Sequence, residues 1–199
     1  MRIASWVTIA VLTLAEAAAG GTGAVKGRVT SEGSAATPVA NAVVLIEGPQ
    51  TPASPGAPHA TIDQRNVTFV PHVLAVPVGT TVDFPNHDST LHNVFSASAA
   101  KKFDLGMYDR GESRSVTFDV PGIIRIGCNA HAKMEAFVVV HTNPYAAVTD
   151  AQGAYTVDQV PPASYRVRVW HESMPEAETR VDVHDGQVEH VDLRLQPRR

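Results

Sequence analysis

The sequence predicts an all-β protein built from two small β-sandwiches. Glycine and proline each occur 14 times in 199 residues and are spread along the chain. Short runs of alternating apolar residues lie between these turn residues, which is typical of sandwiches. No long amphipathic helical pattern and no internal repeat stands out. Roughly 180 residues remain after an N-terminal leader, enough for two such domains.

Residues 1–19 are predicted to be a secretory signal peptide. Arg2 supplies a positive start, an apolar stretch too short to span a membrane follows, and small residues up to Ala19 resemble a cleavage site. An uncleaved membrane anchor is the alternative, but Glu16 interrupts the apolar stretch. We therefore expect export to the periplasm, with no membrane span in the mature chain.

Charge and cysteine usage narrow the function classes. The formal net charge is -4 at pH 7, and no basic run of the kind that follows a phosphate backbone occurs. Nucleic acid is therefore not an expected partner. The single cysteine, Cys128, has no partner for a disulfide within its own chain. An unpaired thiol in an oxidising compartment is a liability unless something such as a metal occupies it.

Two predicted strands and a connector precede the segment that contains the cysteine. Residues 24–30 alternate like a strand, and residues 42–47 form a second apolar run. A connector rich in proline, alanine and glycine, residues 48–57, then separates these strands from the segment that leads to Cys128.

Four residues form a candidate metal site. Cys128, His131 and Met134 stand at every third position, and His92 lies upstream. One thiolate, two imidazoles and a weak axial thioether are the ligands of a blue-copper site. A tight loop between two strands can turn the first three toward one point, while His92 arrives from a neighbouring strand. We predict that these four residues bind one type 1 copper ion.

Each ligand also has a simpler interpretation. Cys128 alone fits an inert buried thiol, Met134 a core residue, and His131 a surface imidazole. Zinc also accepts a cysteine and two histidines, although it seldom uses methionine. The remaining histidines are predicted not to be ligands, with His72 and His87 the nearest exceptions: His59, His72, His87, His141, His171, His184 and His190.

This segment resembles the cupredoxins over about residues 62–141, and we predict a cupredoxin domain at residues 58–142. The upstream match includes the run 78–86, and the short C-x2-H-x2-M loop is similar to that of amicyanins, except that Ala132 stands where proline is usual. The resemblance implies a Greek-key β-sandwich that carries single electrons. It also implies that Asn93 ties the two ligand loops together and that electrons leave through His131.

The flanking segments resemble another family, the carboxypeptidase regulatory-like domain, a transthyretin-like β-sandwich. The resemblance covers residues 25–46 and 147–195, although 163–164 are Ala-Ser where the family has a glycine before the tyrosine. Each half lacks the strands that the other supplies. We therefore predict one discontinuous sandwich, residues 24–48 and 144–197, into which the cupredoxin is inserted, because insertion is tolerated where loop ends lie close together.

These observations favour an exported electron carrier over other functions. The resemblance to amicyanins implies a redox protein as partner, a cytochrome or a dehydrogenase. Lys133 and Glu135 beside the loop would set the preference for it through charge. A copper-holding or delivery protein and a surface scaffold are the alternatives. An enzyme is not expected, because four protein ligands leave no open position for substrate. The second sandwich is assigned a structural role or the docking of a glycan or a protein.

Overall fold

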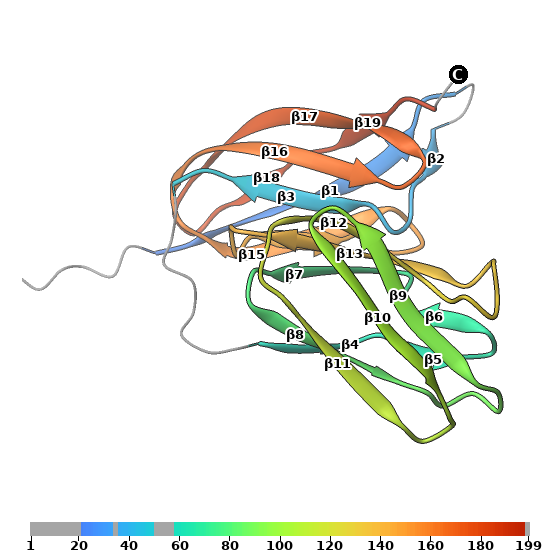
Figure 1. Ribbon diagram of the computed structural model, residues 1–199. Coiled ribbons are helices and arrows are strands. Elements are labelled where there is room, and N and C mark those ends of the chain that lie inside the picture. Colours follow the sequence, from blue (N-terminus) through green and yellow to red (C-terminus); the bar gives the residue numbers. More distant parts are fainter. Residues whose placement is uncertain (1–20, 34–35, 50–57, 198–199) are drawn as a thin grey trace, which may run out of the picture.

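The computed structural model describes residues 21–33, 36–49 and 58–197, which form strands, turns and loops (Figure 1). No helix occurs in this part of the chain, which confirms the all-β prediction. Accordingly, the described residues contain no helix with the length and apolar character to cross a membrane. The predicted signal peptide, residues 1–19, lies outside the described residues.

The two ends of the chain build one pair of sheets, drawn in the upper part of Figure 1. One sheet has the order β15-β1-β18, with β2 and β19 also paired to β1, and the other has the order β14-β3-β16-β17. Strands β1 and β3 precede the inserted segment that contains His92 and Cys128, and their neighbours β15 and β16 follow it. The nine strands are β1 (Gly23–Ser31), β2 (Thr37–Pro38), β3 (Val43–Glu47), β14 (Ala146–Val148), β15 (Ala154–Val160), β16 (Ala163–His171), β17 (Met174–Val183), β18 (Val188–His190) and β19 (Leu193–Leu195).

These strands enclose one hydrophobic core, which residues from both ends of the chain fill. Val25 and Ile46 from the first segment are fully buried against Tyr165 and Val167 from the second. The Thr149 hydroxyl accepts a hydrogen bond from the backbone N–H of Ala42 at 2.9 Å, which joins the two segments again. Neither segment completes a sheet without the other. We call this unit the flank sandwich; the residue bounds predicted for it stay a prediction.

The inserted segment forms a second sandwich with its own core, drawn in the lower part of Figure 1. Its sheets have the orders β10-β9-β12-β13-β7 and β11-β8-β4, beside a short β5-β6 ribbon. Alternate residues such as Phe84, Phe118, Ile124 and Ile126 point into the core, as period two requires. The strands are β4 (His59–Thr61), β5 (Asp63–Arg65), β6 (Thr68–Val70), β7 (Val73–Pro77), β8 (Thr80–Pro85), β9 (His92–Ser98), β10 (Lys101–Tyr108), β11 (Ser113–Phe118), β12 (Gly122–Gly127) and β13 (Glu135–His141).

Strand β13 is covered on both faces, because the two sandwiches pack against each other through it. Val138 and Val140 belong to the core of the inserted sandwich. Val139 belongs to a separate buried cluster with Leu45 and Trp170 of the flank sandwich. A strand buried on both faces reads as a continuous apolar run rather than an alternating one, and residues 137–140 are such a run.

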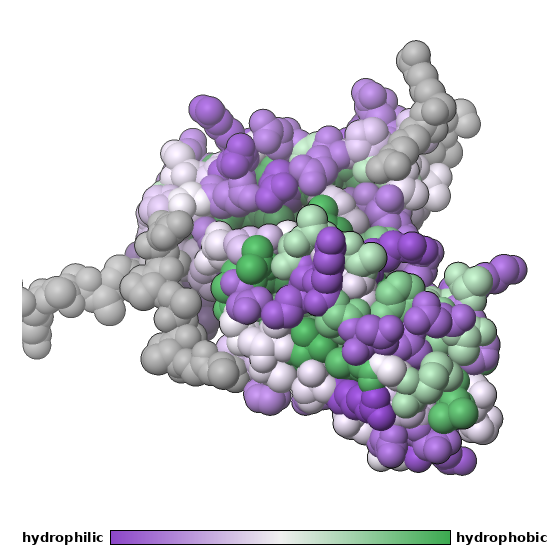
Figure 2. Space-filling view, in the orientation of Figure 1, coloured by the Kyte–Doolittle hydropathy of each residue, from purple (hydrophilic) through white to green (hydrophobic). Residues whose placement is uncertain are grey.

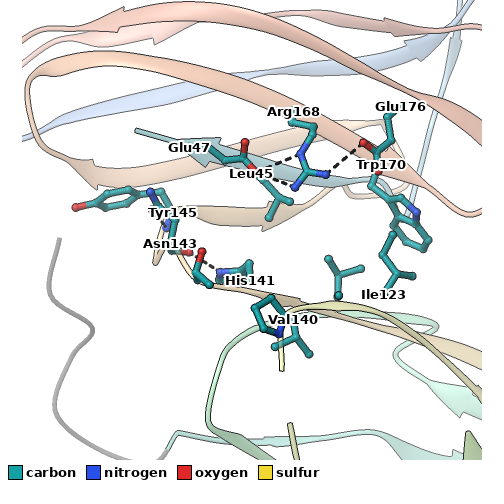
Figure 3. Close-up of a pocket in the computed structure, with 14 residues that line it drawn as sticks. Leu45, Glu47, Ile123, Val140, His141, Asn143, Tyr145, Arg168, Trp170 and Glu176 are labelled. Atoms are coloured by element: carbon teal, nitrogen blue, oxygen red, sulfur yellow. Dashed lines mark hydrogen bonds and ion pairs between the residues drawn. The ribbon is translucent and has the colours of Figure 1, made fainter. Parts of the chain in front are cut away.

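A pocket of about 280 Å³ opens between the sandwiches (Figure 3). It lies at the end of β13 marked by His141, away from Met134. On the flank side, Arg168 spans two carboxylates, with Nη2 2.7 Å from Oε1 of Glu47 and Nη1 3.2 Å from Oε2 of Glu176. In the space-filling view, hydrophilic side chains cover much of the flank sandwich, whereas larger apolar areas lie over the inserted one (Figure 2).

Candidate metal centre

Three of the four predicted ligands meet at one point. Nδ1 of His92 lies 3.2 Å from Nδ1 of His131, and the two nitrogens lie 3.9 and 3.8 Å from Sγ of Cys128. All three ligand atoms lie within 4.8 Å of one another. Across the residues that the structure describes, no other group of three or more His, Cys, Asp or Glu side chains comes this close.

The strand order brings these residues together although they are far apart in sequence. Cys128 directly follows β12, and His92 begins β9, which is the neighbour of β12 in the sheet. The intervening loop bends back on itself, since the backbone N–H of Met134 donates to the carbonyl of His131 at 2.9 Å. His92 is fully buried and Cys128 is 5% exposed, so water has little access to either.

Met134, the fourth predicted ligand, is buried at the start of β13. It is 2% exposed and belongs to the same core cluster as Cys128. Both sulfur-bearing side chains therefore belong to the core of the inserted sandwich. Its role as a ligand stays a prediction.

A carboxylate orients the His92 ring. Oδ2 of Asp88 lies 3.0 Å from Nε2 of His92, on the opposite side of the ring from Cys128. Asp88 also accepts backbone hydrogen bonds from Val67 at 2.6 Å and from Ser89 at 2.9 Å. The Val67 bond contributes most, followed by the His92 bond, to lowering the pKa of Asp88 to about 2. A charged acceptor at Nε2 keeps the proton there and leaves Nδ1 free to bind a metal.

Sequence reasoning missed Asp88. A carboxylate shortly before a metal-binding histidine is a known kind of support, but the spacing to His92 alone does not separate it from an ordinary turn residue. The signal becomes specific only when the loop folds and brings Val67 onto the same carboxylate.

Asn93 makes the expected link between the two ligand loops. Its side-chain Oδ1 accepts from the backbone N–H of Asn129 at 3.2 Å, and its Nδ2 donates to Oδ1 of Asp104 at 2.7 Å. Its backbone N–H points at Sγ of Cys128 from 3.5 Å. One buried residue therefore fixes the sulfur and both loops.

The two histidines singled out as exceptions lie outside the cluster. His87 pairs with Asp63, at 2.7 Å between Nδ1 and Oδ1. His72 contacts Glu172 of the flank sandwich instead. Both therefore have other partners.

The donor set fits copper. A buried cysteine sulfur with two imidazole Nδ1 atoms turned toward it is a donor set that copper accepts. Met134, if it is the fourth ligand, would suit copper better than zinc.

Comparisons with known proteins agree with both resemblances. Residues 57–141 match the family model for copper binding proteins of the plastocyanin/azurin family. Residues 131–196 match the family model for the carboxypeptidase regulatory-like domain. The recognition of both families from sequence is thereby confirmed. The second match covers the C-terminal part of the flank sandwich and β13, but not β1 to β3.

Three solved structures are each similar to part of the chain. The chain is similar to a purple cupredoxin from Nitrosopumilus maritimus, with 28% identity over 41% of this chain and 99% of that one, and a TM-score of 0.38. It is also similar to the copper-containing nitrite reductase of Thermus scotoductus SA-01, with 28% identity, a TM-score of 0.40, and coverage of 41% of this chain and 22% of that one. A reduced mutant of amicyanin gives 24% identity, a TM-score of 0.40, and coverage of 49% and 98%. No curated protein matches the chain.

Proposed function

We propose that this protein is an exported copper protein that carries single electrons between redox partners, with one type 1 copper ion bound by His92, Cys128, His131 and Met134. The observation that supports this most directly is the convergence of one thiol and two imidazole Nδ1 atoms within 4.8 Å at a largely buried point. A bound copper ion would supply the one-electron redox couple. The protein would supply rigid positions for the ligands and a surface for the redox partner.

The first contribution of the protein is rigidity. An electron carrier works best when its ligands keep their positions in both oxidation states, so the groups that hold them must themselves be fixed. Asp88 fixes the His92 ring, and Asn93 fixes both the Cys128 sulfur and the loop that follows it. His92 and Asn93 lie in β9, which is paired along its length with β10.

The second contribution is a surface for a redox partner. His131 is half-buried, and its neighbours Ala130 and Ala132 are exposed and small. Two exposed apolar residues flank the site: Leu91, directly before His92, and Met107, which pairs with Asn93 across the sheet, are 45% and 46% exposed. A small apolar patch suits the weak, short-lived contacts of redox proteins.

Charge around the patch would select the partner. The carboxylate of Glu135 is held by Arg125, with Nε and Nη2 at 2.8 and 2.6 Å from Oε2. Lys133 is exposed, and among the described residues it has no ion pair. Of the two charges expected to set preference, we therefore assign the larger effect to Lys133, which favours a partner with an acidic rim. A cytochrome or a dehydrogenase with such a rim fits.

A carrier is favoured over an enzyme because the proposed set of four protein ligands leaves no position for a substrate. Export to the periplasm is proposed on the leader at residues 1–19 and on the lone cysteine.

Titration of the purified, metal-free protein with Cu(II) tests the proposal. We expect an intense visible charge-transfer band at one equivalent, absent in Cys128→Ser, because the transition originates in the thiolate. The loaded protein should then accept and return one electron per copper over repeated cycles with small redox reagents. Copper binding with no band would exclude the type 1 assignment. Rapid loss of the reduced ion to a chelator would favour a delivery protein, and no binding would favour a scaffold.

A further inference from the structure

One ion pair joins the two sandwiches beside the metal loop. Glu172 lies in the turn between β16 and β17 of the flank sandwich, and His72 directly precedes β7 of the inserted sandwich. Oε1 of Glu172 is 2.7 Å from Nε2 of His72. The other ring nitrogen of His72, Nδ1, is 3.2 Å from the carbonyl oxygen of Glu135, the residue that follows Met134. A single imidazole therefore bridges the flank sandwich and the end of the ligand loop.

Both partners of the His72 ring are hydrogen-bond acceptors. A carboxylate and a carbonyl accept hydrogen bonds and donate none, so a ring protonated at both nitrogens would donate to both partners. The Glu135 side chain is held separately by Arg125, and only its backbone carbonyl faces Nδ1 of His72. With a doubly protonated ring the bridge would be a charge-assisted pair, which is stronger than a neutral one.

Packing holds the bridge from both sides. The backbone carbonyl of His72 accepts from the N–H of Phe137 at 2.8 Å, and the two rings meet edge to face at 5.7 Å. Phe137 in turn contacts Trp170 of the flank sandwich, with ring centroids 5.4 Å apart. The His72 and Glu172 side chains are 30% and 26% exposed. An ion pair of this exposure contributes little to the free energy of unfolding, so its effect is expected to be local.

We propose that Glu172 is a positioning residue for the metal site: through His72 it holds the Glu135 carbonyl, and with it Met134, at the start of β13. This deepens the proposed function and rests on it, because it takes Met134 as a ligand. It gives the flank sandwich a role toward the copper centre, as a support that fixes where the axial thioether stands. Groups beyond the direct ligands commonly set metal affinity and redox potential.

The first test uses the metal-free protein, so it does not depend on copper. Backbone amide exchange is measured at Met134 and Phe137, whose N–H groups donate to His131 and His72. In Glu172→Ala we expect these two amides to exchange roughly three- to tenfold faster, a smaller effect than the loss of a direct ligand partner. The matched control is Glu178→Ala, which removes an acid from β17 that pairs with Arg166 within the flank sandwich.

Two further variants distinguish a specific effect on the position of Met134 from a general loss of rigidity in β7 and β13. Glu172→Gln keeps an oxygen that accepts from His72, so exchange at Met134 should return most of the way to the wild-type rate. In the background of His72→Phe, Glu172→Ala should have no additional effect, because the two residues act as one unit. Faster exchange across all of β7 and β13 in Glu172→Ala, or equal effects of Glu172→Ala and Glu178→Ala, would overturn the proposal.

The second test uses the copper-loaded protein. Glu172→Ala should change the electron paramagnetic resonance signature and weaken Cu(II) binding by roughly three- to tenfold, while Glu178→Ala changes neither. An unchanged signature in Glu172→Ala would overturn the proposal. Failure of the proposed function looks different: the wild-type protein itself would then show no thiolate band, whereas the exchange result would be unaffected.

Discussion

Asp88 and His92 form a hydrogen-bonded pair in which Oδ2 lies 3.0 Å from Nε2, on the side of the ring that faces away from Cys128. The carboxylate is itself held by the backbone of Val67 and Ser89. The His92 ring is therefore fixed before any metal arrives, with its proton on Nε2 and its Nδ1 turned toward the thiol. A ligand whose orientation and tautomer are set in advance loses little entropy on binding.

Removing this carboxylate should weaken metal binding. We expect Asp88→Ala to lower Cu(II) affinity by about 10- to 100-fold, because the ring can then rotate and its proton can move to Nδ1. Affinity is measured by competition with a chelator. Asp119→Ala, which removes a surface carboxylate paired with Lys101, is the control and should bind normally. Asp88→Asn, which keeps a side-chain oxygen as acceptor, should fall between the two. Normal affinity in Asp88→Ala would show that packing alone orients His92.

Met134 is expected to tune the redox potential more than it holds the metal. Met134→Leu conserves volume at a position that is 2% exposed, so the free energy of unfolding should change by less than about 1.5 kcal/mol. Because the axial bond is weak and long, copper should stay bound, with a higher reduction potential measured by voltammetry. Met107→Leu, at a surface methionine 46% exposed, is the control. Loss of copper from Met134→Leu as complete as in Cys128→Ser would contradict the weak axial role.

The sequence was informative wherever the chemistry is local. Cys128, His131 and Met134 lie in one short loop, so their spacing alone indicates a shared site, and alternating residues such as Ile124 and Ile126 identify buried faces without any knowledge of the partner sheet. The interrupted sandwich was inferred from sequence because residues 24–48 carry apolar faces that nothing within that segment can cover, and its residue bounds stay a prediction.

Contacts between segments that are distant in the sequence could not be predicted from the sequence. The Asp88 support depends on the β5–β6 turn reaching the carboxylate through Val67, and the Glu172–His72 bridge joins residues a hundred positions apart. Neither has a characteristic spacing. The double coverage of β13 explains its continuous apolar run, but the run itself does not indicate that a second domain covers it.

The shared core of the flank sandwich predicts a separable effect on stability. Ile46, in β3, is fully buried against residues from β16. Ile46→Ala should lower the free energy of unfolding of the flank sandwich by about 2–5 kcal/mol. The transition can be followed by fluorescence of Trp170, the single tryptophan of the described residues. The copper band at low denaturant should be unchanged, because Ile46 lies outside the core cluster that contains Cys128.

Val188→Ala, at an exposed position in the same sandwich, serves as the control and should have little effect. If Ile46→Ala abolished copper binding in the native protein, the two sandwiches would form one cooperative core. That result would contradict the separation into distinct hydrophobic clusters.

His141 should make the protein less stable in mild acid. It is 8% exposed at the end of β13, and burial lowers the pKa of its imidazole below the usual 6.5, although a hydrogen bond with the Asn143 carbonyl partly offsets the effect. Below about pH 6.5 the unfolded chain therefore binds a proton that the folded protein does not, and stability falls as the pH falls. The neutral imidazole makes its full contribution to the free energy of unfolding above pH 6.5. This contribution decreases as the pH falls from 6.5 toward the pKa of His141 in the folded protein. The free energy of unfolding of the metal-free protein is measured with denaturant from about pH 8 to about pH 5, the range in which histidine titrates. In His141→Gln the decrease should be shallower, whereas His190→Gln, at an exposed histidine, should follow the wild-type curve. Parallel curves for wild type and His141→Gln would show that His141 becomes protonated without cost, which the buried position at the pocket does not allow.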